Sequence, residues 1–137
     1  MSCALCDTRM QKGSQIVCET DLVFVMVNFE PVKDPHVMVL PKRCLSDMRL
    51  LSLEESFALF QMCDRIMDGM ERELDESPMM MVNGVGFRTQ PQHLHIHILP
   101  SKYPLRGLLV ASENRPERRR ATNEELVNMA DRVKRFI

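Results

Sequence analysis

The chain has 137 residues, with 18 basic and 19 acidic side chains and a net charge of −1 at pH 7. This balance offers no strongly basic surface for a nucleic acid or an acidic membrane, and no apolar run approaches the roughly 20 residues of a membrane helix. The N-terminus lacks the charged-then-apolar order of a signal peptide. We therefore expect one compact domain, residues 1–137, that lies in the cytoplasm and binds neither nucleic acid nor membrane.

Apolar segments with strand character come first in the chain. Residues 14–27 predict two short strands around a Glu-Thr-Asp turn, and residues 36–42 predict another that Pro41 stops. Further along, residues 78–83 predict a strand. Residues 93–99, HLHIHIL, alternate between polar and apolar side chains, as a half-buried strand does.

Two capping boxes mark the starts of predicted helices. The first precedes apolar residues at helical spacing and predicts one long amphipathic helix over about residues 53–75. The second predicts a C-terminal helix over about residues 122–136. The two pairs are Ser52 with Glu55, and Thr122 with Glu125. Strands, a long helix, strands and a short helix together predict an α+β fold with an antiparallel sheet.

Three of the four histidines in the chain stand at alternate positions, His93, His95 and His97. On a strand they would share one face, with successive side chains about 6.5–7 Å apart, too far for all three to bind one metal ion. Burying three polar rings would require three sets of hydrogen-bond partners, so a purely structural role is disfavoured. The pattern leaves two possibilities open, a pair of metal ligands on the strand or nucleophilic and acid–base chemistry.

The surrounding motifs resemble the histidine triad (HIT) superfamily. HLHIHIL fits its signature His-φ-His-φ-His-φ-φ, where φ is apolar, and HVMVLPK, which begins at His36, fits its upstream strand. Asn28 has the spacing of a ribose-binding residue, and Asn83 precedes a glycine-rich loop as in the family. The resemblance covers about residues 3–100 and implies an antiparallel sheet with one long helix, followed by a C-terminal extension with the helix about 122–136.

The resemblance also implies a reaction. The middle histidine, His95, would attack the α-phosphorus of a purine nucleoside phosphoramidate or dinucleoside polyphosphate and form a covalent nucleotidyl-histidine. His97 would donate to a phosphate oxygen or to the leaving group. The implied substrate-binding residues are Asn28, His36, Asn83, Thr89 and Gln90. Two positions depart from the family: Pro35 stands where glycine is usual, and Thr89 where glutamine is common.

The N-terminal CALC pair is a weak signal by itself, compatible with a redox pair, half of a metal site or chance. Bacterial members of the family hold structural zinc with such a pair, a residue shortly after the upstream P-K and the first histidine of the triad. The resemblance thus implies a structural Zn²⁺ on Cys3, Cys6, Cys44 and His93. The remaining cysteines, Cys18 and Cys63, we expect to be buried thiols.

Two other functions stay open. One is a non-catalytic module with the same fold that binds zinc and nucleotide. The other is a metalloenzyme that uses His93 and His95 as a zinc pair. The resemblance further implies a homodimer with the helix 53–75 at its interface. The basic run at 115–120 is expected to be a solvated loop.

Overall fold

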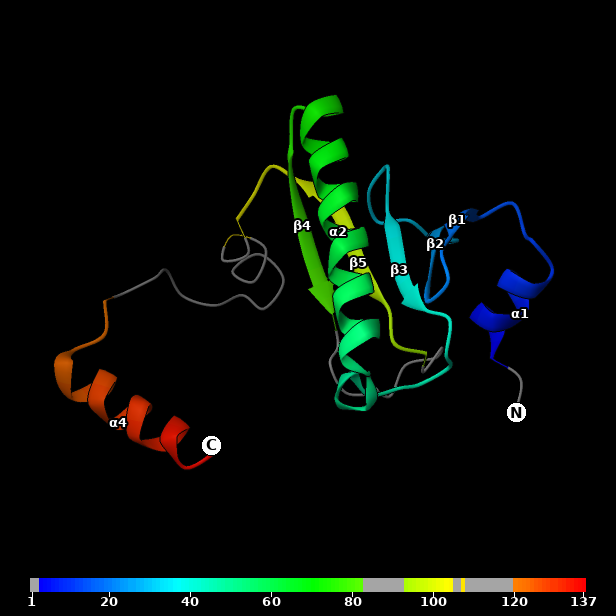
Figure 1. The fold of residues 1–137 in the computed structure, drawn as a ribbon. Helices are drawn as coiled ribbons and strands as arrows, with labels where there is room; N and C mark the ends of the chain where they lie inside the picture. Colours follow the sequence, from blue (N-terminus) through cyan, green and yellow to red (C-terminus); the bar gives the residue numbers. More distant parts are fainter. Residues whose placement is uncertain (1–2, 83–92, 105–106, 108–119) are drawn as a thin grey trace. The chain divides into compact units, whose positions relative to one another are not determined.

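The computed structural model describes residues 3–82, 93–104, 107 and 120–137 (Figure 1). The chain divides into two compact units, Met1–Lys102 and Tyr103–Ile137. The sheet belongs to the first unit, and the helix α4 (Asn123–Lys134) belongs to the second. Within the described ranges, none of the helices has both the length and the apolarity needed to cross a membrane. The expectation of a single domain over the whole chain stays a prediction.

The first unit is built on a five-stranded sheet with the order β1-β2-β3-β5-β4. Every neighbouring pair is antiparallel, which confirms the predicted α+β class. β1 and β4 form the two edges. The strands are β1 (Ile16–Glu19), β2 (Val23–Val27), β3 (Val37–Pro41), β4 (Ser77–Val82) and β5 (Ile96–Ser101).

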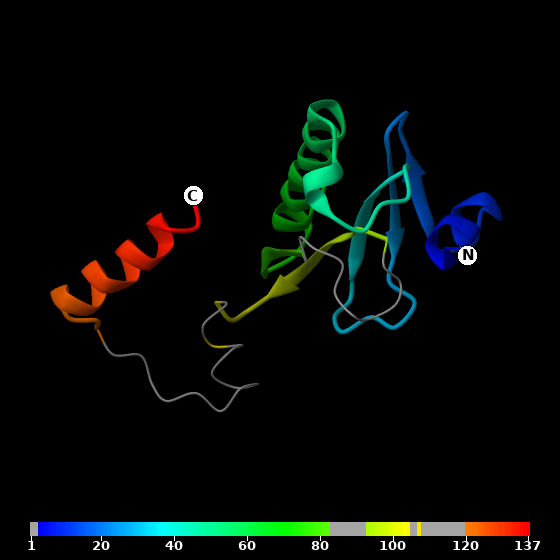
Figure 2. The same ribbon diagram turned by 90° about the horizontal axis from the view of Figure 1, so that it is seen from below.

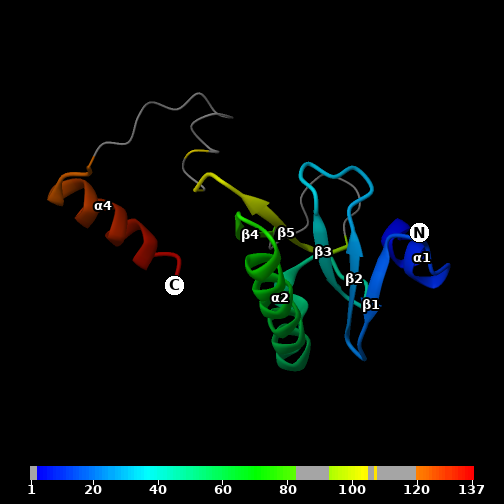
Figure 3. The same ribbon diagram turned by 90° about the horizontal axis from the view of Figure 1, so that it is seen from above.

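The two faces of the sheet are covered differently. The long helix α2 (Leu53–Glu73) lies along one face, and the short helix α1 (Ala4–Met10) lies on the other side (Figures 2 and 3). On the α2 side the buried aliphatic side chains of the sheet are Val23, Val25, Val37, Val39, Ile96 and Ile98. On the opposite side the buried residues are Phe24, Met26, Met38 and Leu40, with Leu5 of α1 packed against them. Each such burial contributes about 1.5–3 kcal/mol, so both faces hold the central strands in place.

The start of α2 differs in one contact from the predicted capping box. The Ser52 hydroxyl accepts from the backbone N–H of Glu55 at 3.1 Å, as predicted. The Glu55 carboxylate, however, accepts from Arg43 at 3.0 and 3.1 Å, so it is engaged away from the N-cap. This ion pair joins the segment after β3 to the helix. By contrast, α4 begins with the complete capping box of Thr122 and Glu125.

The strand predicted over 93–99 begins three residues later, at Ile96. The backbone N–H of Leu94 donates to the carbonyl of Leu45 at 2.7 Å, outside the sheet ladder. The prediction of one continuous strand through all three histidines was therefore wrong, since His93 and His95 precede the strand. Leu94 and Ile96 are nevertheless buried, as the alternation predicts.

The two cysteines outside the predicted metal site, Cys18 and Cys63, differ in their exposure. Cys63 is buried in α2, as expected, and burial raises the pKa of its thiol to about 11. Cys18 is exposed, which contradicts the expected buried thiol. It lies on the edge strand β1, where a shift in register occurs between Ile16 and Cys18. An edge strand has a neighbour on one side only, and the other residues of β1 are at most half-buried.

Candidate functional site

A hydrogen bond made by the ring of His95 identifies which of its two nitrogens carries the proton. Its Nδ1 lies 2.7 Å from the backbone carbonyl oxygen of His93. A carbonyl oxygen can only accept, so Nδ1 carries the proton and donates. The Nε2 of neutral His95 then bears an unprotonated lone pair, the form in which an imidazole is a nucleophile.

His36 and His97 belong to a chain of hydrogen bonds in which each group donates to the next. The backbone N–H of Val32 donates to Nδ1 of His36 at 3.3 Å, so His36 carries its proton on Nε2. That Nε2 lies 2.8 Å from Nδ1 of His97 and donates to it. Nε2 of neutral His97 consequently carries the proton and is a hydrogen-bond donor. The rings of His95 and His97 lie edge to face, 4.6 Å between centroids, so a nucleophile and a donor stand side by side.

Burial favours the neutral form of both rings in this chain. Desolvation by burial lowers the pKa of His36 below its usual value, and the neighbouring His95 adds to the effect. Burial, together with His95 and His36, lowers the pKa of His97 to about 4. At neutral pH His97 is therefore an uncharged donor, in agreement with the tautomer that the hydrogen bonds define.

The lowered pKa of His97 makes the stability of the fold depend on pH. The pKa of His97 is about 4 in the folded chain and near 6.5 in the unfolded chain, so only the unfolded chain takes up the proton between these values. The free energy of unfolding is therefore unaffected by His97 above pH 6.5 and falls as the pH falls toward 4. With allowance for the exposed part of the ring, we expect a loss of about 2 kcal/mol. Urea unfolding at pH 4–8 should show this extra loss in the wild type relative to His97→Asn. Parallel pH profiles for the two proteins would contradict it.

The structure brings together the four predicted metal ligands Cys3, Cys6, Cys44 and His93, with their ligand atoms all within 4.8 Å of one another. Cys3 is the N-cap of α1, Cys6 lies in its first turn, Cys44 follows β3 and His93 precedes β5. The cluster is therefore assembled from three separate parts of the chain.

The orientation of His93 suits a metal ligand. Its Nε2 donates to the carbonyl of Pro41 at 2.8 Å, which leaves the lone pair of Nδ1 facing the sulfurs. Nδ1 lies 3.4 Å from Sγ of both Cys3 and Cys6. In a tetrahedral site with metal–sulfur and metal–nitrogen bonds of about 2.3 and 2.0 Å, this edge would be about 3.5 Å. The donor set therefore fits a divalent ion and could hold one.

Methionines flank His97 in the sheet, a feature that the sequence pattern did not reveal. In the ladder His97 is paired with Met38 on β3 and with Met81 on β4. Met38 is in turn paired with Met26 on β2. Paired residues project to the same face, so these four side chains form one row across the sheet. The row lies on the face opposite α2, because alternate residues of β5 are packed against that helix.

Asn28, just after β2, contacts this row at Met38. Its side-chain nitrogen donates to Sδ of Met38 at 3.5 Å, and its oxygen accepts from the backbone N–H of Glu30 at 2.8 Å. The backbone N–H of Asn28 donates to the carbonyl of His36. The predicted ribose-binding residue is thus linked to the histidine chain. The other predicted substrate contacts, Asn83, Thr89 and Gln90, lie outside the described residues.

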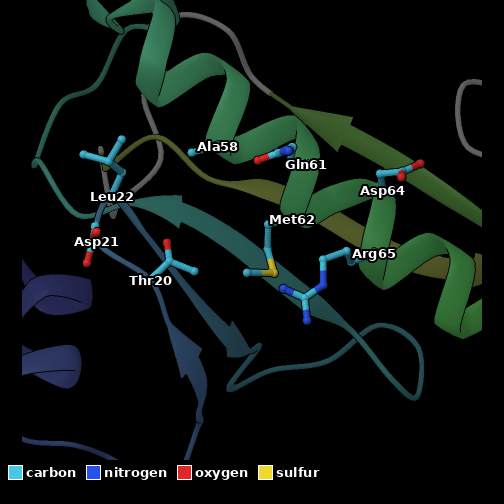
Figure 4. A pocket seen from close by; sticks show the side chains of 8 residues that line it. All are labelled: Thr20, Asp21, Leu22, Ala58, Gln61, Met62, Asp64 and Arg65. Carbon is cyan, nitrogen blue, oxygen red and sulfur yellow. The ribbon is translucent and has the colours of Figure 1, made fainter.

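A groove of about 470 Å³ lies elsewhere, between the β1–β2 turn and α2 (Figure 4). Residues 20–22 line it from the turn, and the helix contributes Ala58, Gln61, Met62, Asp64 and Arg65. It is on the α2 side of the sheet, away from the face that carries His97. The groove is therefore separate from the histidine site.

These features define a protein with a histidine site on one face of an antiparallel sheet and a thiol–imidazole cluster beside it. A family model described as HIT domain matches residues 9–103, and the chain belongs to the HIT family. This membership confirms the resemblance seen in the sequence.

Individual relatives agree with this assignment. The chain is 34% identical over 93 residues to bis(5'-adenosyl)-triphosphatase of Dictyostelium discoideum, covering 66% of this chain and 62% of that protein. It is 29% identical over 92 residues to the asymmetrical bis(5'-nucleosyl)-tetraphosphatase of Schizosaccharomyces pombe, covering 66% and 50%. The chain thus spans only part of the length of these relatives. A HIT family protein from Bacillus subtilis has the same fold, with a TM-score of 0.70 at 18% identity, over 100% of this chain and 98% of that one.

Proposed function

We propose that the protein is a HIT-type nucleotide hydrolase or nucleotidyl transferase. It acts at the α-phosphate of a dinucleoside polyphosphate or a nucleoside phosphoramidate, through a covalent intermediate on His95. The observation that carries the proposal is the unprotonated Nε2 of His95 beside the protonated Nε2 of His97. Relatives named as a triphosphatase and a tetraphosphatase support the dinucleoside polyphosphate class in particular.

In the proposed first step, Nε2 of His95 bonds to the α-phosphorus while the bond from phosphorus to the leaving group breaks. The ring of His95 becomes positively charged, and the His93 carbonyl that accepts from its Nδ1 stabilises that charge. A nucleoside polyphosphate departs as an oxyanion that a hydrogen bond from Nε2 of His97 stabilises, whereas the amine of a phosphoramidate gains a proton from solvent as it leaves. Water or another acceptor then attacks phosphorus and loses its proton to solvent, while the bond from phosphorus to Nε2 of His95 breaks and its electron pair returns to the ring.

Other residues would hold the substrate in this reaction. Asn28 would bind the ribose, and His36 would keep His97 in the donor tautomer. Asn83 would also bind the substrate, and Thr89 and Gln90 would face its phosphates. A cytoplasmic location belongs to the same proposal.

Trapping the intermediate tests the mechanism. The chain is mixed with a dinucleoside triphosphate labelled at the α-phosphate, quenched in alkali, in which phosphorus–imidazole bonds survive, and digested for mass spectrometry. The expected result is one nucleotidyl group on the peptide that contains His95. Turnover without any labelled peptide, under conditions that trap a known nucleotidyl-histidine, would contradict the covalent route. Binding of the nucleotide without turnover would favour the non-catalytic module.

We further propose that Cys3, Cys6, Cys44 and His93 hold a structural Zn²⁺. Bound there, the ion would link the separate segments that carry its ligands, and it would take no part in the reaction at phosphorus. His93 would then be held on one side by the metal site and on the other by Pro41, so its carbonyl would keep its position beneath His95. A zinc pair on His93 and His95 has less support, because Nδ1 of His93 faces the cysteines.

A homodimer is the third part of the proposal. Leu53, Phe57 and Phe60 are exposed on α2 at positions that share one helix face. Met80 and Val82 are exposed on β4, an edge strand whose hydrogen-bonding groups can pair with another copy. Such an apolar surface on a helix and an adjacent edge is typical of a two-fold interface.

Replacing Phe57 with glutamate is expected to convert the dimer to a monomer, because a charge would be buried at the apolar contact. Size exclusion with light scattering measures the mass. Val17→Glu, on the opposite edge strand, is the matched control and should leave the dimer intact. A wild-type chain that is monomeric at all concentrations would contradict the proposal.

A further inference from the structure

Helix α1 carries an arginine on the same side as the metal-site cysteines. Cys3 is the N-cap, Cys6 lies three residues further on, and Arg9 three residues beyond that. Residues three apart on a helix are neighbours on its surface, so Arg9 follows Cys6 along one face. No motif of the sequence accounts for this arginine.

The guanidinium of Arg9 is directed into the protein. Its central carbon lies 5.5 Å from the centroid of the Phe24 ring, within the range of a cation–π contact. Phe24 in turn meets the ring of His93 edge to face, with 6.0 Å between centroids. The cation therefore lies one aromatic ring away from a metal-site ligand.

The hydrogen bonding of Arg9 is incomplete for so enclosed a cation. Its Nε is buried and has no hydrogen-bond partner among the described residues. Its ion pair with Glu19 is long, 3.8 Å, and Glu19 also pairs with Lys42 at 3.2 Å.

With a divalent ion bound, the cluster would carry a negative charge. Three thiolates and a neutral imidazole around a divalent ion carry a net charge of −1, and a partly buried negative centre is stabilised by a nearby positive one. We propose that Arg9 is a positioning residue for the metal site, whose charge compensates the tris-thiolate centre and raises its affinity for the ion. The inference rests on the proposed metal site, and it assigns Arg9 a role beyond anchoring α1 to the sheet.

The test measures Zn²⁺ affinity by competition with a chromophoric chelator, on the full chain. Arg9→Met keeps the apolar stem and removes the charge, and it is expected to weaken Zn²⁺ binding by about 10–100-fold. Arg9→Lys keeps the charge and should restore most of the affinity. Glu19→Gln is the matched control, because it removes the ion pair that anchors Arg9 to β1 and leaves the arginine in place. It should bind Zn²⁺ as tightly as the wild type or more tightly.

The absorption of bound Co²⁺ gives a second measure. A tetrahedral cobalt spectrum that Arg9→Met shares with the wild type supports an effect of charge on an intact ligand set. A spectrum that loses its tetrahedral form would overturn the inference, because Arg9 would then act on the fold. So would equal Zn²⁺ affinity in Arg9→Met and the wild type, or a loss in Glu19→Gln as large as in Arg9→Met. A wild-type chain that binds no Zn²⁺ stoichiometrically would instead overturn the metal site itself.

Discussion

Replacing His95 with alanine is expected to lower kcat by about 10⁴-fold or more, the size of loss seen when the nucleophile of a covalent mechanism is removed. The physical reason is that the other unprotonated nitrogens of the histidine chain, Nδ1 of His36 and Nδ1 of His97, already accept hydrogen bonds, whereas Nε2 of His95 keeps its lone pair for phosphorus. Release of nucleoside monophosphate from diadenosine triphosphate and from adenosine phosphoramidate, without added metal, measures the effect. The better substrate of the two then identifies the leaving group.

His97→Asn is the matched control for this variant. Asparagine removes the Nε2 donor and leaves His95 in place, so a smaller loss of about 10²–10³-fold is expected, as for the removal of a single stabilising donor. Both variants should still bind nucleotide, which isothermal titration can show. If His95→Ala keeps activity within tenfold of the wild type, His95 is not the nucleophile and the central proposal is wrong.

Removing the metal from the cluster is expected to lower Tm by about 10–20 °C. At a free ion concentration 1,000 times the dissociation constant, binding contributes about 4 kcal/mol to the folded state, and each kcal/mol changes Tm by roughly 2–8 °C, depending on domain size. A large effect is expected because the ligands come from three separate parts of the chain, which the ion would link: α1, the segment after β3 and the residues before β5. Scanning calorimetry before and after dialysis against a chelator measures it.

Two serine variants separate the metal site from general thiol chemistry. Cys44→Ser removes one ligand and should reproduce most of the loss in Tm without a chelator. Cys18→Ser changes an exposed thiol outside the cluster and should melt like the wild type, with the same response to chelation. A Tm that the chelator does not change, in protein shown to contain the ion beforehand, would exclude a structural role for it.

Several elements could be predicted because their signals are local. The apolar runs in residues 14–27, the run that ends at Pro41 and the helical spacing of apolar residues in 53–75 can each be recognised within one segment. Helix α1 (Ala4–Met10) was not predicted, because seven residues with few apolar side chains have too little periodicity to indicate a helix. The hydrogen bonding of Glu55 also depends on a residue outside the helix, since its carboxylate accepts from Arg43 and not from the N-cap backbone as the capping box requires.

The sequence by itself determined the resemblance to the family and the three alternating histidines, because both rest on residue types at short, recognisable spacing. Through that resemblance it also predicted the four ligands Cys3, Cys6, Cys44 and His93, which the fold then brought together. Only the tertiary structure decided the start of β5 at Ile96, the protonated nitrogen of each ring, the methionines beside His97 and the place of Arg9. These depend on partners remote in sequence, such as the carbonyl of Pro41 that orients His93. A hydrogen bond or a register between distant segments forms only when the chain is folded, so no periodicity along the chain can encode it.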